Sequence, residues 1–276
     1  MSQSSSNSQV TKGSNFKGIG SFLLKNDTLV GLVLLCIILS LSTDYFLSIS
    51  NFMNVLQQVS VIGIIAIGMT FIITSAEIDL SVGSVVAFSG SVMGVLFALF
   101  DFPIGIAIII AMLGSLLLGL IMGMISIKFV IPSFIVTLAS MMTVRGLAFI
   151  ITDGYPSPID SEFTKWIGQK STLGIPHSVF IFVIVVFLGY YLLEKSRFGR
   201  YVLAVGGNKE AARIAGINVT KIRLIVFSMS GLLAGLAGVV LASQFGAGSP
   251  NSGNMYELDA IAAVVLGGTN LYGGRG

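Results

Sequence analysis

The stretch EKSRFGRYVLAVGGNKEAARIAGINVTKIR, Glu194–Arg223, is the longest well-charged run in an otherwise apolar chain. The hydrophobic run FIFVIVVFLGYYLL precedes it, and LIVFSMSGLLAGLAGVVLA follows. The stretch holds seven of the 15 Lys and Arg residues of the chain: Lys195, Arg197, Arg200, Lys209, Arg213, Lys221 and Arg223. A basic loop between two apolar runs of spanning length is typical of a cytoplasmic loop in a membrane protein.

A short helix is predicted inside this loop. Asn208 is a suitable N-cap, Glu210 lies in the first turn, where the helix dipole favours an acid, and Gly216 can end the helix. Three apolar side chains fall on one face of this helix: Ala211, Ile214 and Ala215. Lys209 and Arg213 point away from that face. A helix of about two turns is not stable alone in water. It must pack on the helix ends of its own chain or on a soluble partner, and the residues alone leave both possibilities open.

Composition identifies the class of protein. Of 276 residues, 54% are hydrophobic and only 10% are charged, against about a quarter charged in soluble domains. Long unbroken apolar runs predict an all-α integral membrane protein, since a transmembrane barrel shows short alternating segments. The net charge of +3 is concentrated in loops, so no nucleic-acid partner is needed to explain it. Cys36 is the only cysteine, which excludes a disulfide within the chain.

The apolar runs predict a polytopic helical bundle of about eight membrane segments, with a polar, disordered, cytoplasmic tail at residues 1–26 and a membrane domain at residues 27–276. The segments lie near residues 28–47, 55–75, 82–100, 104–127, 132–152, 178–193, 222–243 and 258–272. The positive-inside rule places the N-terminus and the loop 194–223 in the cytoplasm. The loop 153–177, in which acids outnumber lysines, is expected outside.

Two internal patterns accompany these segments. Glycines recur four residues apart, which predicts close helix packing: Gly90 and Gly94, Gly119 and Gly123, Gly231 and Gly235. The sequence EIDL at Glu77–Leu80 is echoed by ELDA at Glu257–Ala260. The two copies begin segments of opposite direction, which indicates a possible inverted repeat.

Polar side chains in or beside the apolar runs are candidates for a translocation pathway: Gln57, Gln58, Thr70, Thr74, Glu77, Arg145 and Glu257. Other roles remain open for several of them. The Gln and Thr side chains could bond a neighbouring helix, and Arg145 could hold helices together. Asp79 and Asp259 are expected at the membrane interface, where each could cap the helix that follows.

Motifs for chemistry are missing from the sequence. It contains no GxxxxGK[ST], so the chain has no ATP-binding P-loop of its own. His177 is the only histidine and has no partner constellation. We therefore expect no catalytic residue, no metal site and no cofactor in this chain, which is not expected to be an enzyme.

Four runs together resemble the permease subunit of bacterial ABC importers for ribose and related monosaccharides: residues 57–84 (QQVSVIGIIAIGMTFIITSAEIDLSVGS), 131–149 (IPSFIVTLASMMTVRGLAF), 196–223 and 256–276 (YELDAIAAVVLGGTNLYGGRG). The resemblance implies that two copies form a pore in the cytoplasmic membrane and that an external binding protein delivers the sugar. It also implies that a separate cytoplasmic ATPase, which binds the ATP, docks on the short helix. That helix comprises Asn208, Lys209, Glu210, Ala211, Ala212, Arg213, Ile214, Ala215, Gly216 and Ile217. A bulky charged residue at Ala212 or Ala215 is expected to stop ATP-driven uptake without preventing membrane insertion.

The chain departs from the family pattern at two places. Ala76-Glu77 stands where relatives often carry glycine, and relatives continue past the final GGRG, so we expect a fragment or a short form. Alternative substrates within the family are autoinducer-2 and inositol. A secondary transporter driven by an ion gradient is a further alternative. It would need ionisable residues at mid-depth, whereas the acids here are expected at segment ends.

Overall fold

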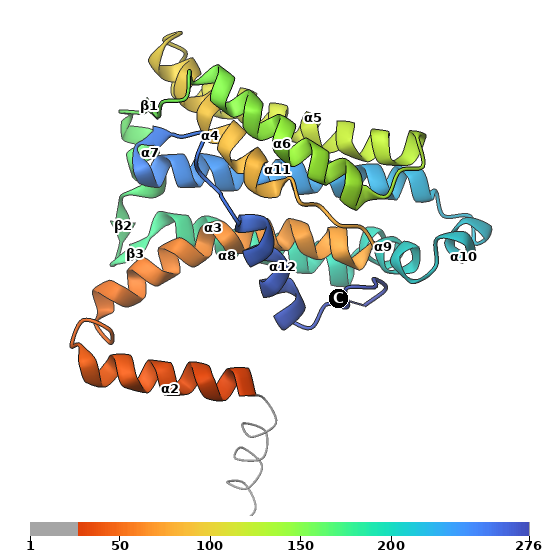
Figure 1. Ribbon diagram of the computed structural model, residues 1–276, viewed down its shortest axis with the longest axis horizontal. Helices are drawn as coiled ribbons and strands as arrows, with labels where there is room; N and C mark the ends of the chain where they lie inside the picture. The colour runs from red at the N-terminus through yellow and green to blue at the C-terminus, as the bar shows by residue number, and fades with distance from the viewer. Residues whose placement is uncertain (1–26, 276) are drawn as a thin grey trace, which may run out of the picture. The chain divides into compact units, whose positions relative to one another are not determined.

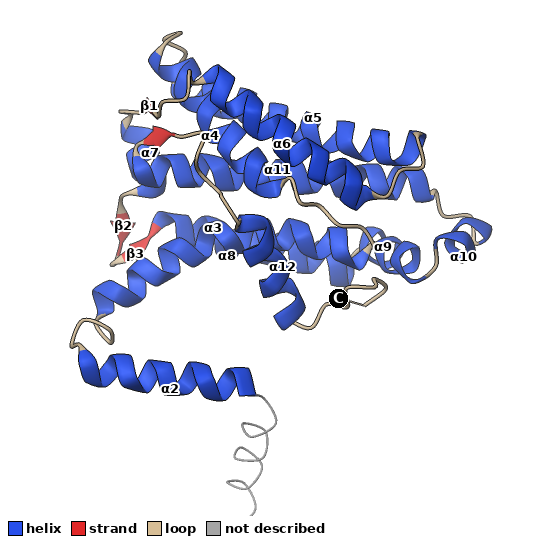
Figure 2. Ribbon diagram, viewed as in Figure 1, coloured by secondary structure: helices blue, strands red, loops and turns tan. Residues whose placement is uncertain are grey.

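The computed structural model describes residues 27–275, and these are almost entirely helical (Figure 1, Figure 2). The tail expected at residues 1–26 lies outside the described residues. Two units make up the chain, the first ending at Phe52 and the second beginning at Met53. The first unit contains helix α2 (Asp27–Ser42), whose leucines and isoleucines are mostly exposed. A helix that is apolar around its whole circumference suits a lipid environment.

The second unit contains most of the described helices and four short strands. Its main helices are α3 (Ile49–Thr74), which begins in the first unit, α4 (Val82–Ala98), α5 (Ile104–Lys128), α6 (Ser133–Ile151), α8 (His177–Tyr190) and α11 (Val219–Phe245). The π-helical turn η1 (Tyr191–Lys195) continues α8. Shorter helices are α7 (Glu162–Gly168), α9 (Arg197–Gly207), α10 (Lys209–Ile214) and α12 (Tyr256–Leu266). Strand β1 (Ser157–Pro158) pairs antiparallel with β4 (Ala247–Gly248), and β2 (Ser171–Thr172) with β3 (Ile175–Pro176).

Helix α11 is the centre of the second unit and packs most extensively against α5 and α4. Side chains of α5 explain why: five of its seven buried positions lie four residues apart and are small, namely Ala107, Ala111, Ser115, Gly119 and Gly123, and the other two are Met122 and Ser126. The large side chains of the same helix are exposed, among them Ile106, Ile109, Leu113, Leu117 and Ile121. Small residues inside and large apolar residues outside are the arrangement expected for helices packed in lipid.

The glycines four residues apart confirm the predicted close packing. A Cβ atom on Gly119 would lie 2.3 Å from the carbonyl oxygen of Phe227, and one on Gly231 would lie 2.3 Å from that of Ser115. Helices α5 and α11 therefore touch backbone to backbone. On the other side of α11, a Cβ atom on Gly238 would lie 2.4 Å from the carbonyl oxygen of Val86 in α4.

Each of the eight predicted segments coincides with a helix, but not all of these helices can cross a membrane unaided. Among the described residues, five helices are long and apolar enough by length and composition: α3, α5, α6, His177–Lys195 and α11. Val30–Ser42 and α4 are apolar but shorter, and α12 has 11 residues. The chain is thus a polytopic helical membrane protein, whose described residues combine long apolar helices with shorter ones.

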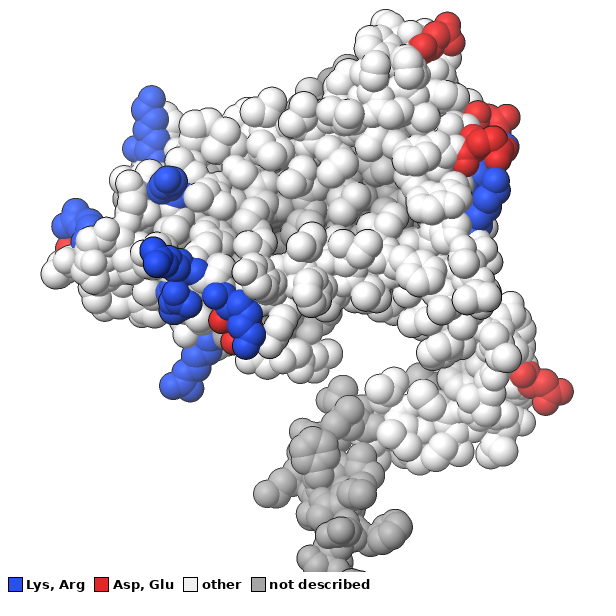
Figure 3. Space-filling model, turned by 180° about the vertical axis from the view of Figure 1, so that it is seen from behind, with Lys and Arg blue, Asp and Glu red and all other residues white. Residues whose placement is uncertain are grey.

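Charged side chains of the second unit gather at its two ends (Figure 3). One end, here called the basic end, is formed where α5 finishes and α11 starts, with α9 and α10 beside them. It carries Lys128 and the cations of the stretch 194–223. The opposite end, here called the acidic end, carries Asp101, Asp153, Asp160 and Glu162, together with Lys165 and Lys170. The charge asymmetry predicted from the sequence is therefore present in space.

Two long helices end in a non-helical break followed by a shorter helix. Helix α3 is followed by the break 75–81 and α4, and α11 is followed by the break 246–255 and α12. The first break leads inward, since Asp79 just before α4 bonds Ser230 near the middle of α11. Helix α4 then runs beside the second half of α11, where Ser89 Oγ donates to the Gly235 carbonyl.

Candidate functional site

Helix α10 has the caps that the sequence predicted. Asn208 Oδ1 accepts a hydrogen bond from the Ala211 amide at 2.9 Å, and Glu210 lies in the first turn. At the other end, Gly216 has φ +82, its amide donates to the Arg213 carbonyl, and the Ile217 amide donates to the Ala212 carbonyl. These two bonds form a Schellman motif, which uses the left-handed glycine to satisfy the last carbonyls of the helix.

The two faces of α10 differ. Ala212 is buried against the second unit, and Ile217 packs on its core. Ala211, Ile214 and Ala215 point away from the body of the protein, and Ile214 is 80% exposed. The predicted apolar face is thus present and uncovered. Because Ala212 is buried, a large residue there would disturb the seat of α10, whereas Ala215 is an exposed position.

Lys209, the first residue of α10, joins a buried cluster of charges with Glu77 and Arg223. The Glu77 side chain is only 3% exposed, and its Oε1 atom lies 2.8 Å from Lys209 Nζ and 2.6 Å from Arg223 Nε. The Arg223 contact is an ion pair without hydrogen-bond geometry. A cavity of about 380 Å³ adjoins the cluster. Glu77 therefore borders this cavity at the basic end. Its pairing with Lys209 of α10 was not predicted from the sequence.

Asp79 lies elsewhere than expected. The sequence predicted an interfacial residue capping the next helix, but Asp79 is buried at the level of the middle of α11. Its Oδ1 atom accepts from the Ser81 amide and hydroxyl at 2.9 and 2.6 Å, and its Oδ2 atom accepts from Ser230 Oγ at 2.8 Å. The interfacial expectation was wrong because the break 75–81 enters the bundle. Asp259 is exposed in the first turn of α12, as expected for an acid that favours a helix start.

A second cavity, of about 530 Å³, lies between α3, the end of α11 and the start of α12 and is here called the amide-lined cavity. Its polar lining consists of amide side chains and one phenol: Asn54, Gln57, Gln58, Gln244 and Tyr256. The apolar lining comes from Val61, Ile62, Leu241 and Phe245. Gln57 and Gln58 were predicted pathway residues. The other three were missed, because they lie about 190 residues further along the chain or, for Asn54, at the start of the helix.

The remaining pathway candidates are dispersed. Thr70 borders two mainly apolar cavities, and Thr74 is buried at the end of α3, with no hydrogen-bond partner for its hydroxyl among the described residues. Arg145 of α6 donates from Nη1 to the carbonyls of Pro250, at 2.8 Å, and Ser252. Arg145 thereby holds the break 246–255 to α6, whereas the structural role left open by the sequence was to hold helices together.

Glu257 lies at the first turn of α12 beside the start of α4. A Cβ atom on Gly83 would meet the Glu257 Oε2 atom at 2.5 Å and the Gly253 carbonyl oxygen at 2.3 Å. The break 246–255 and the start of α12 therefore meet the start of α4 at Gly83. Only a glycine allows this approach, because the Gly253 carbonyl is backbone and cannot turn aside.

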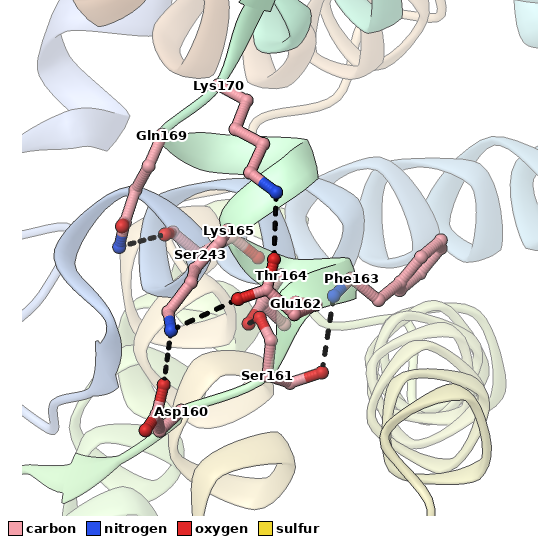
Figure 4. Close-up of polar contacts among 9 residues, drawn as sticks. All are labelled: Asp160, Ser161, Glu162, Phe163, Thr164, Lys165, Gln169, Lys170 and Ser243. Carbon is pink, nitrogen blue, oxygen red and sulfur yellow. Dashed lines mark hydrogen bonds and ion pairs between the residues drawn. The ribbon is translucent and has the colours of Figure 1, made fainter.

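Helix α7 closes the acidic end next to the amide-lined cavity. Gln57 Nε2 donates to the Gly168 carbonyl at 2.7 Å. Gln169 Nε2 donates to the Ser243 carbonyl at 3.2 Å, as Figure 4 shows. A Cβ atom on Gly168 would lie 2.3 Å from the Gln244 amide nitrogen. Helix α7 and the adjoining Gln169 are thus bonded to both α3 and α11, the two helices that supply most of the cavity lining.

An exposed network of ion pairs surrounds the start of α7 (Figure 4). Lys165 Nζ lies 2.6 Å from Asp160 Oδ1 and 3.4 Å from Glu162 Oε1, and Lys170 Nζ lies 2.8 Å from Glu162 Oε2. The hydrogen bond from Lys165 lowers the pKa of Asp160, and those from Lys170 and then Lys165 lower the pKa of Glu162. All four side chains are solvent-exposed, so each pair contributes little to stability.

A family model described as the permease component of branched-chain amino acid transport systems matches residues 51–274. The chain belongs to this permease family. The ribose import permease protein RbsC of Haemophilus influenzae is 42% identical over 267 residues, which cover 95% of this chain and 82% of the relative. RbsC of Bacillus subtilis is 42% identical over 252 residues, covering 90% and 77%, and the xylose transport system permease protein XylH of Escherichia coli is 33% identical over 330 residues, covering 97% and 84%. No solved structure matches.

Membership of this permease family confirms the resemblance identified from the four sequence runs. The family consists of transport permeases, so the chain is not an enzyme, as the missing catalytic motifs predicted. For a permease, the features to explain are a contact for an energy source and a path for a solute. Helix α10 and the amide-lined cavity are the described features that suit these two tasks.

Proposed function

We propose that this chain is the membrane-spanning permease subunit of an ABC importer that carries a monosaccharide, ribose or a close relative, across the cytoplasmic membrane. A separate ATPase subunit binds and hydrolyses the ATP. The observation that supports this most directly is the exposed apolar face of α10. A capped helix of six residues, seated by Ala212 and presenting Ile214 outward, is a preformed contact for a soluble protein.

The basic end faces the cytoplasm in this proposal, and the N-terminus lies on the same side. Cations of the stretch 194–223 lie there, whereas the acidic end carries Asp101, Asp153, Asp160 and Glu162. Cytoplasmic loops of membrane proteins are enriched in Lys and Arg. The ATPase then meets α10 from the cytoplasm, and an external sugar-binding protein approaches the acidic end. A second copy of the chain completes the pore.

The solute is assigned from the amide-lined cavity. Its lining contains amide and phenol groups, which can each donate and accept hydrogen bonds, and contains no Asp, Glu, Lys or Arg. Such a lining suits an uncharged solute with several hydroxyl groups. Ribose is favoured because the relatives at 41–42% identity include ribose import permeases. Autoinducer-2 and inositol have the same chemistry and remain alternatives for the test.

A secondary transporter driven by an ion gradient is the competing function, and Asp79 is the observation that bears on it. A carboxyl group buried at mid-depth is a default candidate for ion or proton coupling. Asp79, however, is bonded by Ser81 and Ser230 and is not among the residues that line the cavities described above. We therefore assign it a structural role in fixing the break 75–81 to α11.

Reconstitution separates the two functions. The permease is placed in vesicles with labelled ribose, with and without the ATPase and binding protein that co-purify with it. Uptake that requires both partners and ATP supports the proposal. Uptake by the permease alone that follows an ion gradient would instead establish the secondary transporter. Competition by unlabelled inositol and autoinducer-2 then ranks the solutes.

A further inference from the structure

Glu77 connects two parts of the protein that lie far apart in sequence. Its partner Lys209 is 132 residues away and belongs to α10, while Arg223 belongs to the first turns of α11. Glu77 itself belongs to the break 75–81. A buried carboxylate is strongly unfavourable without a compensating cation, so Glu77 is tied to the position of its partners.

The two cations are not equivalent. Arg223 is 16% exposed, and its Nη2 atom donates to Ser126 Oγ at 3.1 Å, which fixes it to the end of α5. Lys209 is 44% exposed and reaches Glu77 from the first residue of α10. Arg223 is therefore a stationary partner that keeps Glu77 neutralised. Lys209 is the partner that moves whenever α10 moves.

The break 75–81 is fastened beyond Glu77 as well. The Ile78 amide donates to Ser133 Oγ at 3.1 Å, and the Ile78 carbonyl accepts from Thr137 Oγ1 at 3.2 Å. Asp79 is bonded to Ser230, as described above. These bonds tie the break to α6 and α11, so Glu77 and the start of α4 belong to one bonded segment and not to a free loop.

The start of α4 lies against the second break. Gly83 touches the Gly253 carbonyl and the Glu257 carboxylate, and the neighbour of Glu257, Tyr256, lines the amide-lined cavity. The described contacts thus form a continuous chain from α10 through Glu77, the break 75–81 and α4 to the wall of that cavity. Coupling between distant sites requires a contiguous physical connection of this kind.

We propose that Glu77 is a positioning residue that passes the movement of α10 to the amide-lined cavity, with Lys209 as the link that α10 pulls. The inference rests on the proposed function, because it needs an ATPase that shifts α10. In this arrangement the ion pair between Lys209 and Glu77 transmits force, while the pair between Arg223 and Glu77 preserves the fold. Removing Lys209 therefore breaks the link without leaving Glu77 unpaired.

The test measures whether ATP changes the access of a reagent to the cavity. Gln58, an exposed lining residue, is replaced as Gln58→Cys in a Cys36→Ser background, and the assembled complex with its ATPase is labelled with a thiol reagent. Labelling rates are compared with and without ATP. This readout does not depend on which solute is carried. A purely structural role of Lys209 would alter assembly or stability and leave the ATP response of the assembled complex unchanged.

In the parent complex, ATP is expected to change the labelling rate by about tenfold, within the usual range of coupling between sites. Lys209→Met should abolish that change while the ATPase still binds, and Lys209→Arg should retain it. Lys221→Met is the matched control, since it removes an exposed cation of the basic end, from the first turn of α11. It should respond like the parent.

Two results would overturn the inference, and they can be told apart from failure of the proposed function. An unchanged ATP response in Lys209→Met, or an equal loss in Lys221→Met, refutes the role of the Lys209–Glu77 link alone. A parent complex in which no ATPase binds, or in which ATP leaves the labelling rate unaltered, refutes the proposed function and the inference together.

Discussion

Replacement of Ile214 with alanine tests the contact proposed for the ATPase. Ile214→Ala removes three carbon atoms, each worth about 0.8 kcal/mol when buried. Since the side chain is 80% exposed in the free permease, nearly all of that burial remains available to a partner. The expected loss is about 2 kcal/mol, or roughly 30-fold in affinity, for a side chain at the centre of a contact. Alanine is also a better helix former than isoleucine, so α10 is not weakened.

The measurement is the affinity of the purified ATPase for the permease in lipid nanodiscs. Ile150→Ala is the matched control, because Ile150 is the same residue type, is 73% exposed, and lies at the end of α6 next to the acidic Asp153. It should leave the affinity unchanged. Equal affinity for Ile214→Ala and the parent would refute the docking role of α10. Equal weakening by both variants would show that the ATPase does not select the basic end.

Two further predictions concern stability. Gly231→Ala would place a methyl group 2.3 Å from a backbone oxygen of α5, so we expect a loss of about 1–3 kcal/mol from overpacking, seen as a lower thermal midpoint in detergent. Gly105→Ala, with nothing within 4 Å, should not lower the midpoint and can raise it slightly, because alanine is a better helix former than glycine. Lys165 lowers the pKa of Asp160 in the folded state. Their ion pair therefore stabilises the folded state at pH values above about 4, the ordinary pKa of a carboxyl group. The stabilisation is lost as the pH falls from there through the lowered pKa of Asp160 in the folded state. Acidification from about pH 5 to 3 should therefore destabilise α7 more strongly in the parent than in Lys165→Met. The measurement is the fluorescence of Trp166, the only tryptophan.

The sequence predicted the helices and their contacts better than the depth of the breaks. Long apolar runs and glycines four residues apart have one main physical explanation, which is lipid-embedded helices in backbone contact. Asp79 shows where this reasoning stops. An acid between two apolar runs is compatible with either membrane surface or with a segment that enters the bundle. The hydrogen bond to Ser230 places Asp79 inside the bundle. Ser230 is 151 residues away, so no pattern in the sequence around Asp79 predicts this bond.

The charged partners of α10 were hidden for a related reason. Lys209 was expected to point away from the apolar face of its helix, which is correct, but solvent and a buried carboxylate can both lie in that direction. Glu77 was taken as a candidate for a wet pathway because it ends an apolar run. A single sequence cannot pair these two residues, since the energetic gain of an ion pair appears only after the chain has folded.

The similar sequences EIDL (Glu77–Leu80) and ELDA (Glu257–Ala260) lie at or just after the two breaks. Each break follows a long helix, of 26 residues in α3 and 27 in α11, and each contains or precedes an acidic pair. Helix α3 runs to the basic end and α11 to the acidic end, so the breaks enter the bundle from opposite sides. The second break reaches the helix that follows the first one, where Gly253 lies against Gly83 of α4. Transporters built from inverted repeats place their solute sites where broken helices meet. This junction is held by Arg145 through the break 246–255 and is connected to Glu77 through the break 75–81. In the proposed function ATP acts at the basic end and the solute enters at the acidic end, so a junction in contact with both ends is what an ABC permease would require.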